Sequence, residues 1–134
     1  MSNALGARTV FLARLVGLFV LVFSLAMLLQ RGAIESALYA LVADRAALLV
    51  VTMIGLVGGL AMALGHNIWS GGPVPVIVTV IGWWLLIKTA VLLFLPTEAV
   101  VALFEGFVDR LYYPVAIIDL AIGFYLTYAG FSRR

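Results

Sequence analysis

The fold is constrained most by a series of apolar runs, each long enough to cross a lipid bilayer. The runs are Leu12–Leu29, Ala46–Gly65, Val74–Leu95 and Tyr113–Phe131. An apolar helix of about 20 residues crosses the hydrocarbon core, and a helix satisfies its backbone hydrogen bonds internally, as lipid requires. The sequence therefore predicts an all-α polytopic membrane protein with four transmembrane helices in a single domain, residues 1–134.

Composition places the chain in a membrane by an independent route. Hydrophobic residues make up 66% and charged residues 10% of the sequence, and the mean hydropathy is +1.24, outside the range of soluble globular domains. The absence of cysteine excludes disulfides and thiolate metal sites. The net charge of +2, with basic residues mainly near the chain ends, fits membrane orientation better than nucleic-acid binding. We expect membrane lipid as a partner and no nucleic acid.

The first apolar run has one feature of a signal peptide, because Arg8 and Arg14 lie at its beginning. A secretory signal, however, has a shorter apolar core and a small-residue cleavage site of the A-x-A type. This run is longer and is not followed by such a site near Gln30. We therefore expect a retained helix.

Two connections between the runs are amphipathic. In residues 97–111, apolar side chains recur at helical spacing while three acidic residues share the opposite face. The segment is too short and too acidic to span, so it is predicted to lie in the membrane interface, with Thr97 as its N-cap. Residues 33–44 show a weaker version of this pattern. We expect two interfacial helices, near residues 34–43 and 98–110, on the same side of the membrane.

The chain also has the pattern of a duplicated half. A shift of 65 residues places Asp44 and Arg45 on Asp109 and Arg110, at the end of each amphipathic segment. The same shift also matches Gly17 with Gly82, Leu21 with Leu86, Leu28 with Leu93, Ala37 with Ala102, Leu38 with Leu103, Tyr39 with Phe104, Gly58 with Gly123 and Gly65 with Gly130. Since each half crosses the membrane twice, the halves are predicted to be parallel repeats related by a pseudo-two-fold axis along the membrane normal.

A polar joint, GHNIWSGGPVP, lies between the halves. Its glycines and prolines suit a turn followed by a helix start, and Trp69 fits the aromatic belt at a membrane interface. His66 and Asn67 have two interpretations: they cap the preceding helix, where a cation complements the dipole and Asn tolerates the left-handed conformation, or they form a working polar site. The first half, the joint and the second half cover about residues 12–65, 66–75 and 76–131.

Small residues recur every fourth position along the second run. Gly55, Gly59 and Ala63 form this ladder, with Gly58 beside it, and Gly123 belongs to a shorter one in the fourth run. Small residues let membrane helices approach closely. The seams are explained either by packing within the bundle or by association of copies, for which a dimer is favoured.

Two charged residues fall inside predicted spans, Lys88 in the third and Asp119 in the fourth. A charge at the bilayer centre costs about 3 kcal/mol unless it is paired or hydrated. Their depths agree within about one helical turn, so we expect them to lie within direct or one-water reach of each other. Their counterparts at the 65-residue shift are Phe23 and Ile54. The pair is either a structural ion pair or a titrating or substrate-binding pair.

The segment GHNIWSGGPVPVIVTVIGWWLLIK resembles a pattern, GHNxWSGG followed by VTxxGWxxLxK, of small bacterial integral-membrane proteins of uncharacterised function. The resemblance covers the joint and the third run. It implies a bacterial inner-membrane setting and the same four-helix plan. It implies no activity for His66, Asn67, Trp69, Gly82 or Lys88.

Orientation follows from basic residues near the ends of the spans. The termini and the joint share one side and carry four arginines, against three in the amphipathic connections. We therefore expect both termini of this multi-pass protein to lie in the cytoplasm.

The sequence contains no P-loop, dinucleotide-binding, serine-hydrolase or zincin motif, and one histidine without cysteine builds no conventional metal site in a single chain. We expect no catalytic site, no metal and no cofactor.

The leading hypothesis is an oligomeric transporter or channel for ions, protons or small solutes that uses Lys88, Asp119 and His66. The alternative is a non-catalytic accessory or scaffold subunit of a larger membrane complex. A third hypothesis is a pigment or haem binder that uses His66 from two copies.

Overall fold

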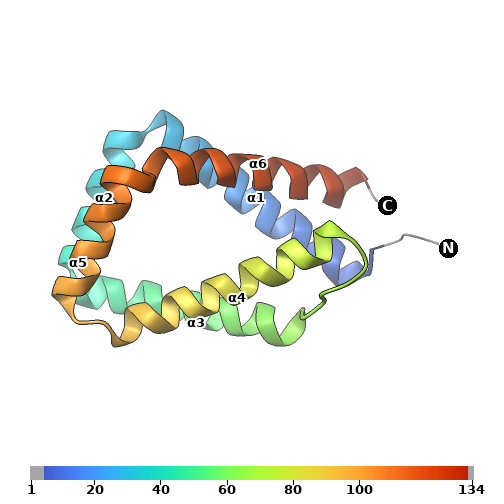
Figure 1. Ribbon diagram of the computed structural model, residues 1–134, viewed down its shortest axis with the longest axis horizontal. Helices are drawn as coiled ribbons and strands as arrows, with labels where there is room; N and C mark the ends of the chain where they lie inside the picture. The colour runs from blue at the N-terminus through green and yellow to red at the C-terminus, as the bar shows by residue number, and fades with distance from the viewer. Residues whose placement is uncertain (1–4, 133–134) are drawn as a thin grey trace.

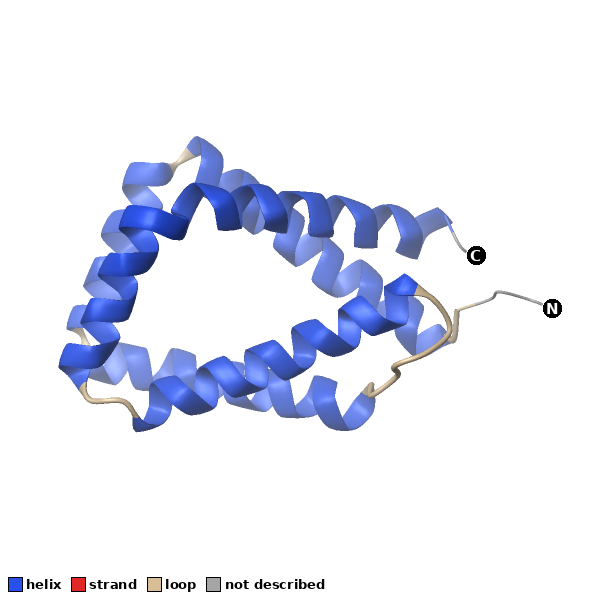
Figure 2. Ribbon diagram, in the orientation of Figure 1, coloured by secondary structure: helices blue, strands red, loops and turns tan. Residues whose placement is uncertain are grey.

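The computed structural model describes residues 5–132 and is helical almost throughout (Figure 2). This range contains no strand, so the all-α class predicted from the sequence is confirmed. In chain order the elements are α1 (Ala7–Leu29), α2 (Arg31–Ala43), α3 (Arg45–Gly65), α4 (Pro73–Phe94), α5 (Thr97–Gly106), the π-helical segment η1 (Phe107–Leu111) and α6 (Tyr112–Ser132).

Among the residues that the structure describes, four helical stretches are long and apolar enough to cross a membrane: Ala7–Leu29, Arg45–Gly65, Pro73–Phe94 and the continuous stretch Thr97–Ser132. The predicted spans coincide with α1, α3, α4 and α6 to within a few residues at each end. Long apolar runs identify such helices whatever packs around them. These helices also expose many large apolar side chains, as contact with lipid requires.

The spanning helices form two antiparallel pairs, α1 with α6 and α3 with α4 (Figure 1). The pairs converge at a narrow end, where the joint connects α3 to α4, and diverge toward a wide end. At the wide end α2 and α5 contact each other, with α2 connecting α1 to α3 and α5 connecting α4 to α6. Both amphipathic helices thus lie at the same end of the molecule, as the sequence predicts.

Two clusters of buried side chains hold this arrangement together. At the wide end, Met27, Tyr112 and Ala116 fix the corner between α1 and α6, where the Tyr112 hydroxyl donates a hydrogen bond to the Met27 carbonyl at 2.8 Å. The narrow-end cluster joins α1, α4 and α6. It consists of Ala13, Val16, Val74, Val78, Leu126 and Ala129.

Glycines set the short distance between the helices of each pair. A Cβ atom at Gly59 would lie 2.6 Å from the Leu86 nitrogen of α4, and one at Gly123 would lie 2.6 Å from the Leu21 nitrogen of α1. Backbones approach this closely only where side chains are absent or small. The predicted seam residues, all of which lie in contacts within the chain, are Gly55, Gly58, Gly59, Ala63 and Gly123.

The two connections at the wide end differ in their backbone. Asp44 separates α2 from α3 and caps α3, because its carboxylate accepts from the backbone nitrogens of Ala46 and Ala47 at 3.0 and 3.1 Å. By contrast, α5 continues through η1 into α6, and Asp109 lies within η1. The prediction of Thr97 as an N-cap is wrong, since Thr97 is already helical and makes no capping hydrogen bond. Its hydroxyl accepts from Arg45 instead.

Candidate functional site

The joint folds over a buried histidine. His66 follows the last residue of α3, and its backbone nitrogen still donates to Met62 at 2.8 Å. The side chain is 1% exposed. Its Nε2 lies 2.9 Å from the Thr9 hydroxyl of α1 and its Nδ1 lies 3.1 Å from the Thr79 hydroxyl of α4. One imidazole therefore joins three spanning helices at the narrow end.

The surrounding hydrogen bonds determine where the proton of His66 lies. The Thr79 hydroxyl donates to the Ile68 carbonyl at 2.9 Å and accepts from the Ile68 nitrogen at 3.1 Å. A hydroxyl has one hydrogen and two lone pairs, so Thr79 accepts from an N–H at Nδ1 of His66. The Nε2 atom then accepts from Thr9. Burial lowers the pKa of His66, and the positive charge of Arg8 lowers it further, so this neutral form is favoured.

The next residue of the joint, Asn67, is hydrogen-bonded to two tryptophans. The Asn67 side-chain oxygen accepts from the indole nitrogens of Trp69 at 2.7 Å and Trp83 at 3.2 Å. The left-handed cap expected at Asn67 is wrong, because the positive φ angles in the described chain occur at Gly71 and Gly72. The amino-acid sequence alone does not indicate Trp83 as a partner of Asn67, because the spacing between the two residues carries no signal.

This geometry favours a structural role for the polar joint. Both ring nitrogens of His66 are already hydrogen-bonded inside the chain, so haem ligation would require breaking at least one of these bonds. In addition, no group of three or more potential metal ligands occurs within residues 5–132.

The two intramembrane charges lie on faces that continue from the narrow-end cluster. Lys88 follows Ile81 by seven residues and Asp119 precedes Leu126 by seven, which is close to two helical turns. Ile81 packs against the cluster and Leu126 belongs to it. Lys88 and Asp119 therefore lie on the inner faces of α4 and α6, where the two helix pairs diverge.

Lys88 and Asp119 make no direct contact with each other. No nitrogen–oxygen distance of 4.0 Å or less joins them; in the described chain that criterion is met by Arg31 and Glu35. Lys88 is exposed and Asp119 is half-buried. A direct ion pair is thus not formed in a single copy, and a water-mediated contact stays a prediction.

A third polar group lies at the corner between α1, α2 and α6. The Arg31 guanidinium lies 4.6 Å from the ring centre of Tyr113 and 5.1 Å from that of Tyr112, and its Nε donates to Glu35 at 3.3 Å. Hydrogen bonding to Tyr113 raises the pKa of Arg31. The i, i+4 spacing of Arg31 and Glu35 could have indicated their contact, but nothing local indicates the tyrosines.

Comparisons of the sequence with protein-family models and with curated proteins, and of the fold with solved structures, find no match.

Proposed function

We propose that this chain is a small transport protein of the bacterial inner membrane that works as an oligomer, with Lys88 and Asp119 as its intramembrane polar site. Its cargo belongs to the class of protons, inorganic ions or small charged solutes. The observation that carries the proposal is that two opposite charges lie on the inner faces of α4 and α6 and make no direct ion pair.

The energetics favour a working site over a structural ion pair. A charged side chain in the middle of a bilayer costs about 3 kcal/mol, and a direct, well-hydrogen-bonded ion pair is the arrangement that best offsets this cost. The charged atoms of Lys88 and Asp119 lie more than 4.0 Å apart, so a water molecule or a solute would be needed to bridge them. A site that exchanges such a ligand requires this separation.

An oligomer supplies what a single copy lacks. Lys88 is exposed in the isolated chain, and the seam glycines are occupied by contacts within the chain. A second copy, packed on the exposed apolar faces of the helix pairs, would shield the site from lipid. The basic residues at the narrow end support an orientation with both termini in the cytoplasm.

Flux measurements in liposomes test the proposal. Purified protein is reconstituted, and proton flux is followed with a trapped pH-sensitive dye and potassium flux with a membrane potential applied. We expect the wild type to conduct at least one of these ions, and Lys88→Met and Asp119→Asn each to abolish most of the flux while the protein still folds. Glu98→Gln and Arg110→Gln are matched controls, because they remove the same charges from the wide end and should leave flux unchanged.

Two results would overturn the proposal. The first is flux that is equal in the wild type and in both intramembrane variants. The second is a wild type without flux that purifies in fixed stoichiometry with a larger membrane complex, which would establish the alternative of an accessory or scaffold subunit.

A further inference from the structure

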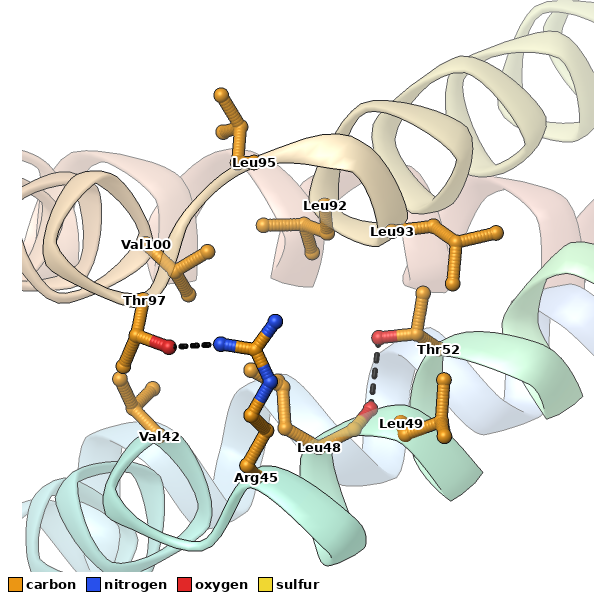
Figure 3. A pocket seen from close by; sticks show the side chains of 10 residues that line it. All are labelled: Val42, Arg45, Leu48, Leu49, Thr52, Leu92, Leu93, Leu95, Thr97 and Val100. Atoms are coloured by element: carbon orange, nitrogen blue, oxygen red, sulfur yellow. Dashed lines mark hydrogen bonds between the residues drawn. The ribbon is translucent and has the colours of Figure 1, made fainter.

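A small cavity at the wide end contains the guanidinium of Arg45, which has no carboxylate within 4.0 Å in the described chain. The cavity has a volume of about 60 Å³ and lies between α2, α3, α4 and α5 (Figure 3). Its walls are mostly aliphatic and include Leu48, Leu49, Leu93 and Val100. The Arg45 side chain extends from the start of α3 into this space (Figure 3).

The hydrogen bonds of Arg45 leave most of its guanidinium free. One terminal nitrogen donates to the Thr97 hydroxyl of α5, and the other points between the side chains of α3 and α4 (Figure 3). Over the described range no carboxylate lies within 4.0 Å of Arg45. Arg31, on the neighbouring helix, has Glu35 as its counter-charge. Arg45 therefore offers several N–H donors and a positive charge with no direct ion-pair partner in the described chain.

The second polar group of the cavity has a free donor. The Thr97 oxygen accepts from Arg45, which leaves its own hydrogen available for an acceptor. Thr52 also lines the cavity, but its hydroxyl already donates to the Leu48 carbonyl at 2.7 Å. A ligand that fits these groups accepts hydrogen bonds from Arg45 and Thr97 together. A planar guanidinium pairs best with a carboxylate or a phosphate.

The position and size of the cavity select the kind of anion. The amphipathic helices α2 and α5 place the wide end at the membrane interface, the depth of lipid headgroups. On this measure one water molecule needs about 10–15 Å³, so a cavity of about 60 Å³ accepts a group of a few heavy atoms, such as a phosphate, and excludes a whole lipid. Leu49 is 48% exposed and Leu93 is 39% exposed. They continue the apolar surface from the cavity along the spanning helices, where an acyl chain can lie.

We propose that Arg45 and Thr97 bind the phosphate of an anionic phospholipid, with the acyl chains of that lipid packed along Leu49 and Leu93. The lipid supplies the direct ion-pair partner that Arg45 lacks in the described chain. It also connects α3 and α5, which carry Arg45 and Thr97, at the end where the two helix pairs are farthest apart.

Lipid titrations of the detergent-solubilised protein test this site. The midpoint of thermal unfolding is measured with increasing phosphatidylglycerol, with phosphatidylcholine as the zwitterionic probe and with inorganic phosphate as the probe without a tail. We expect phosphatidylglycerol to raise the midpoint and the other two to have little effect. Native mass spectrometry should show one retained phosphatidylglycerol for each chain.

Variants distinguish this site from general attraction between a basic protein and an anionic lipid. Arg45→Gln should weaken phosphatidylglycerol binding about tenfold, the equivalent of one charge-assisted hydrogen bond. Thr97→Val should weaken it less, and Arg45→Lys should fall between the wild type and Arg45→Gln because it keeps the charge without the fork. Arg110→Gln is the matched control, since Arg110 occupies the corresponding place in the second half and does not line the cavity.

Three outcomes would overturn the site. The first is an equal loss of phosphatidylglycerol binding in Arg45→Gln and Arg110→Gln. The second is unchanged binding in both single variants, Thr97→Val and Arg45→Lys. The third is a shift of the unfolding midpoint with inorganic phosphate that equals the shift with phosphatidylglycerol. The last result would assign the groups to a free anion instead of a lipid.

Discussion

The two helix pairs, α1–α6 and α3–α4, are packed alike. A Cβ atom at Gly17 of α1 would lie 2.7 Å from the Thr127 nitrogen of α6, and one at Gly82 of α4 would lie 2.7 Å from Cβ of Met62 in α3. Gly17 and Gly82 are 65 residues apart, and so are Met62 and Thr127. The same relation between positions thus produces the same kind of close contact in both pairs.

The pairs differ in how their narrow ends are closed. In α3–α4, the buried His66 bonds to Thr79. At the places 65 residues away, α1–α6 has Phe131 and Arg14, with the guanidinium carbon 4.8 Å from the ring centre. Packing is therefore shared between the pairs, whereas their polar side chains differ. We infer that the glycines maintain the scaffold and that the differing polar groups carry what is specific to each pair. Superposition of the halves at this shift stays a prediction.

The largest loss of stability is expected from substitutions at the glycines where the two helices of a pair are in close contact. Gly59→Val should lower the free energy of unfolding by about 3 kcal/mol, since its side chain would overlap the α4 backbone and force the helices apart. Gly123→Val should cost a similar amount in the other pair. Unfolding by sodium dodecyl sulphate in mixed micelles, followed by circular dichroism, measures both.

Gly106→Ala is the control for these substitutions. Gly106 is helical and a Cβ atom there meets nothing within 4 Å, so the change should be neutral or stabilise by about 0.5–1 kcal/mol. A loss at Gly106 equal to that at Gly59 would contradict the role of close helix contact.

A smaller effect is expected from making the narrow ends alike. His66→Phe places in α3–α4 the residue that α1–α6 has at the corresponding position, and leaves the hydroxyls of Thr9 and Thr79 each short of a partner. Loss of a buried hydrogen-bond partner costs about 1–3 kcal/mol, and we expect about 2 kcal/mol by the same unfolding assay. Arg14→Met should cost less, because Arg14 is only partly buried where it donates to Gly130. A larger loss of stability in Arg14→Met than in His66→Phe would show that His66 is not the residue that stabilises the narrow end most.

Acid should lower the stability of the narrow end, where His66 is buried. The ordinary pKa of histidine is 6.5, and burial lowers the pKa of His66 in the folded chain. The folded state is thus favoured fully above pH 6.5, and this stability is lost as the pH falls from 6.5 toward the lower folded-state pKa. The slope cannot exceed about 1.4 kcal/mol per pH unit for one proton. His66→Gln should remove the part of the pH dependence near pH 6, whereas an unchanged slope would assign it to other groups.

The smallest energetic effect is expected for the coupling between Lys88 and Asp119, two charges that only the second half of the chain contains. Lys88→Met and Asp119→Asn, alone and combined, form a double-mutant cycle for stability in detergent. Because the two side chains make no direct ion pair in one copy, their coupling should be below about 1 kcal/mol. A coupling of several kcal/mol would indicate a buried structural pair and would weaken the transport proposal.

The sequence predicts the spans well because hydrophobic length alone decides them. The predicted span Val74–Leu95 differs from α4 (Pro73–Phe94) by one residue at each end. The continuity of α5 with α6 was not predicted, although Pro114 provides a reason for the π-helical segment. Pro114 has no N–H to bond the carbonyl of Arg110, so the α-helical ladder is interrupted inside η1.

The site residues could be found from sequence only as individual candidates. Lys88, Asp119 and His66 stand out because polar groups are rare in such a chain, but their partners depend on which helices pack together. The contacts of His66 with Thr9 and Thr79 span 57 and 13 residues, and no local pattern predicts them. The cavity beside Arg45 likewise depends on the meeting of α3 and α5.

The π-helical segment η1 also sets the rotational phase of α6. Each residue of an α-helix turns the next by about 100°, and a π turn contains more residues than an α turn. Removal of one residue from Phe107–Leu111 would therefore turn the rest of α6 by about 100° relative to α5. Asp119 would then turn away from the inner face of α6, on which it lies in the present structure. The position of Asp119 relative to Lys88 therefore depends on the helical winding of η1, which lies about two turns before Asp119. The identity of the residue at position 119 is only part of what defines the site.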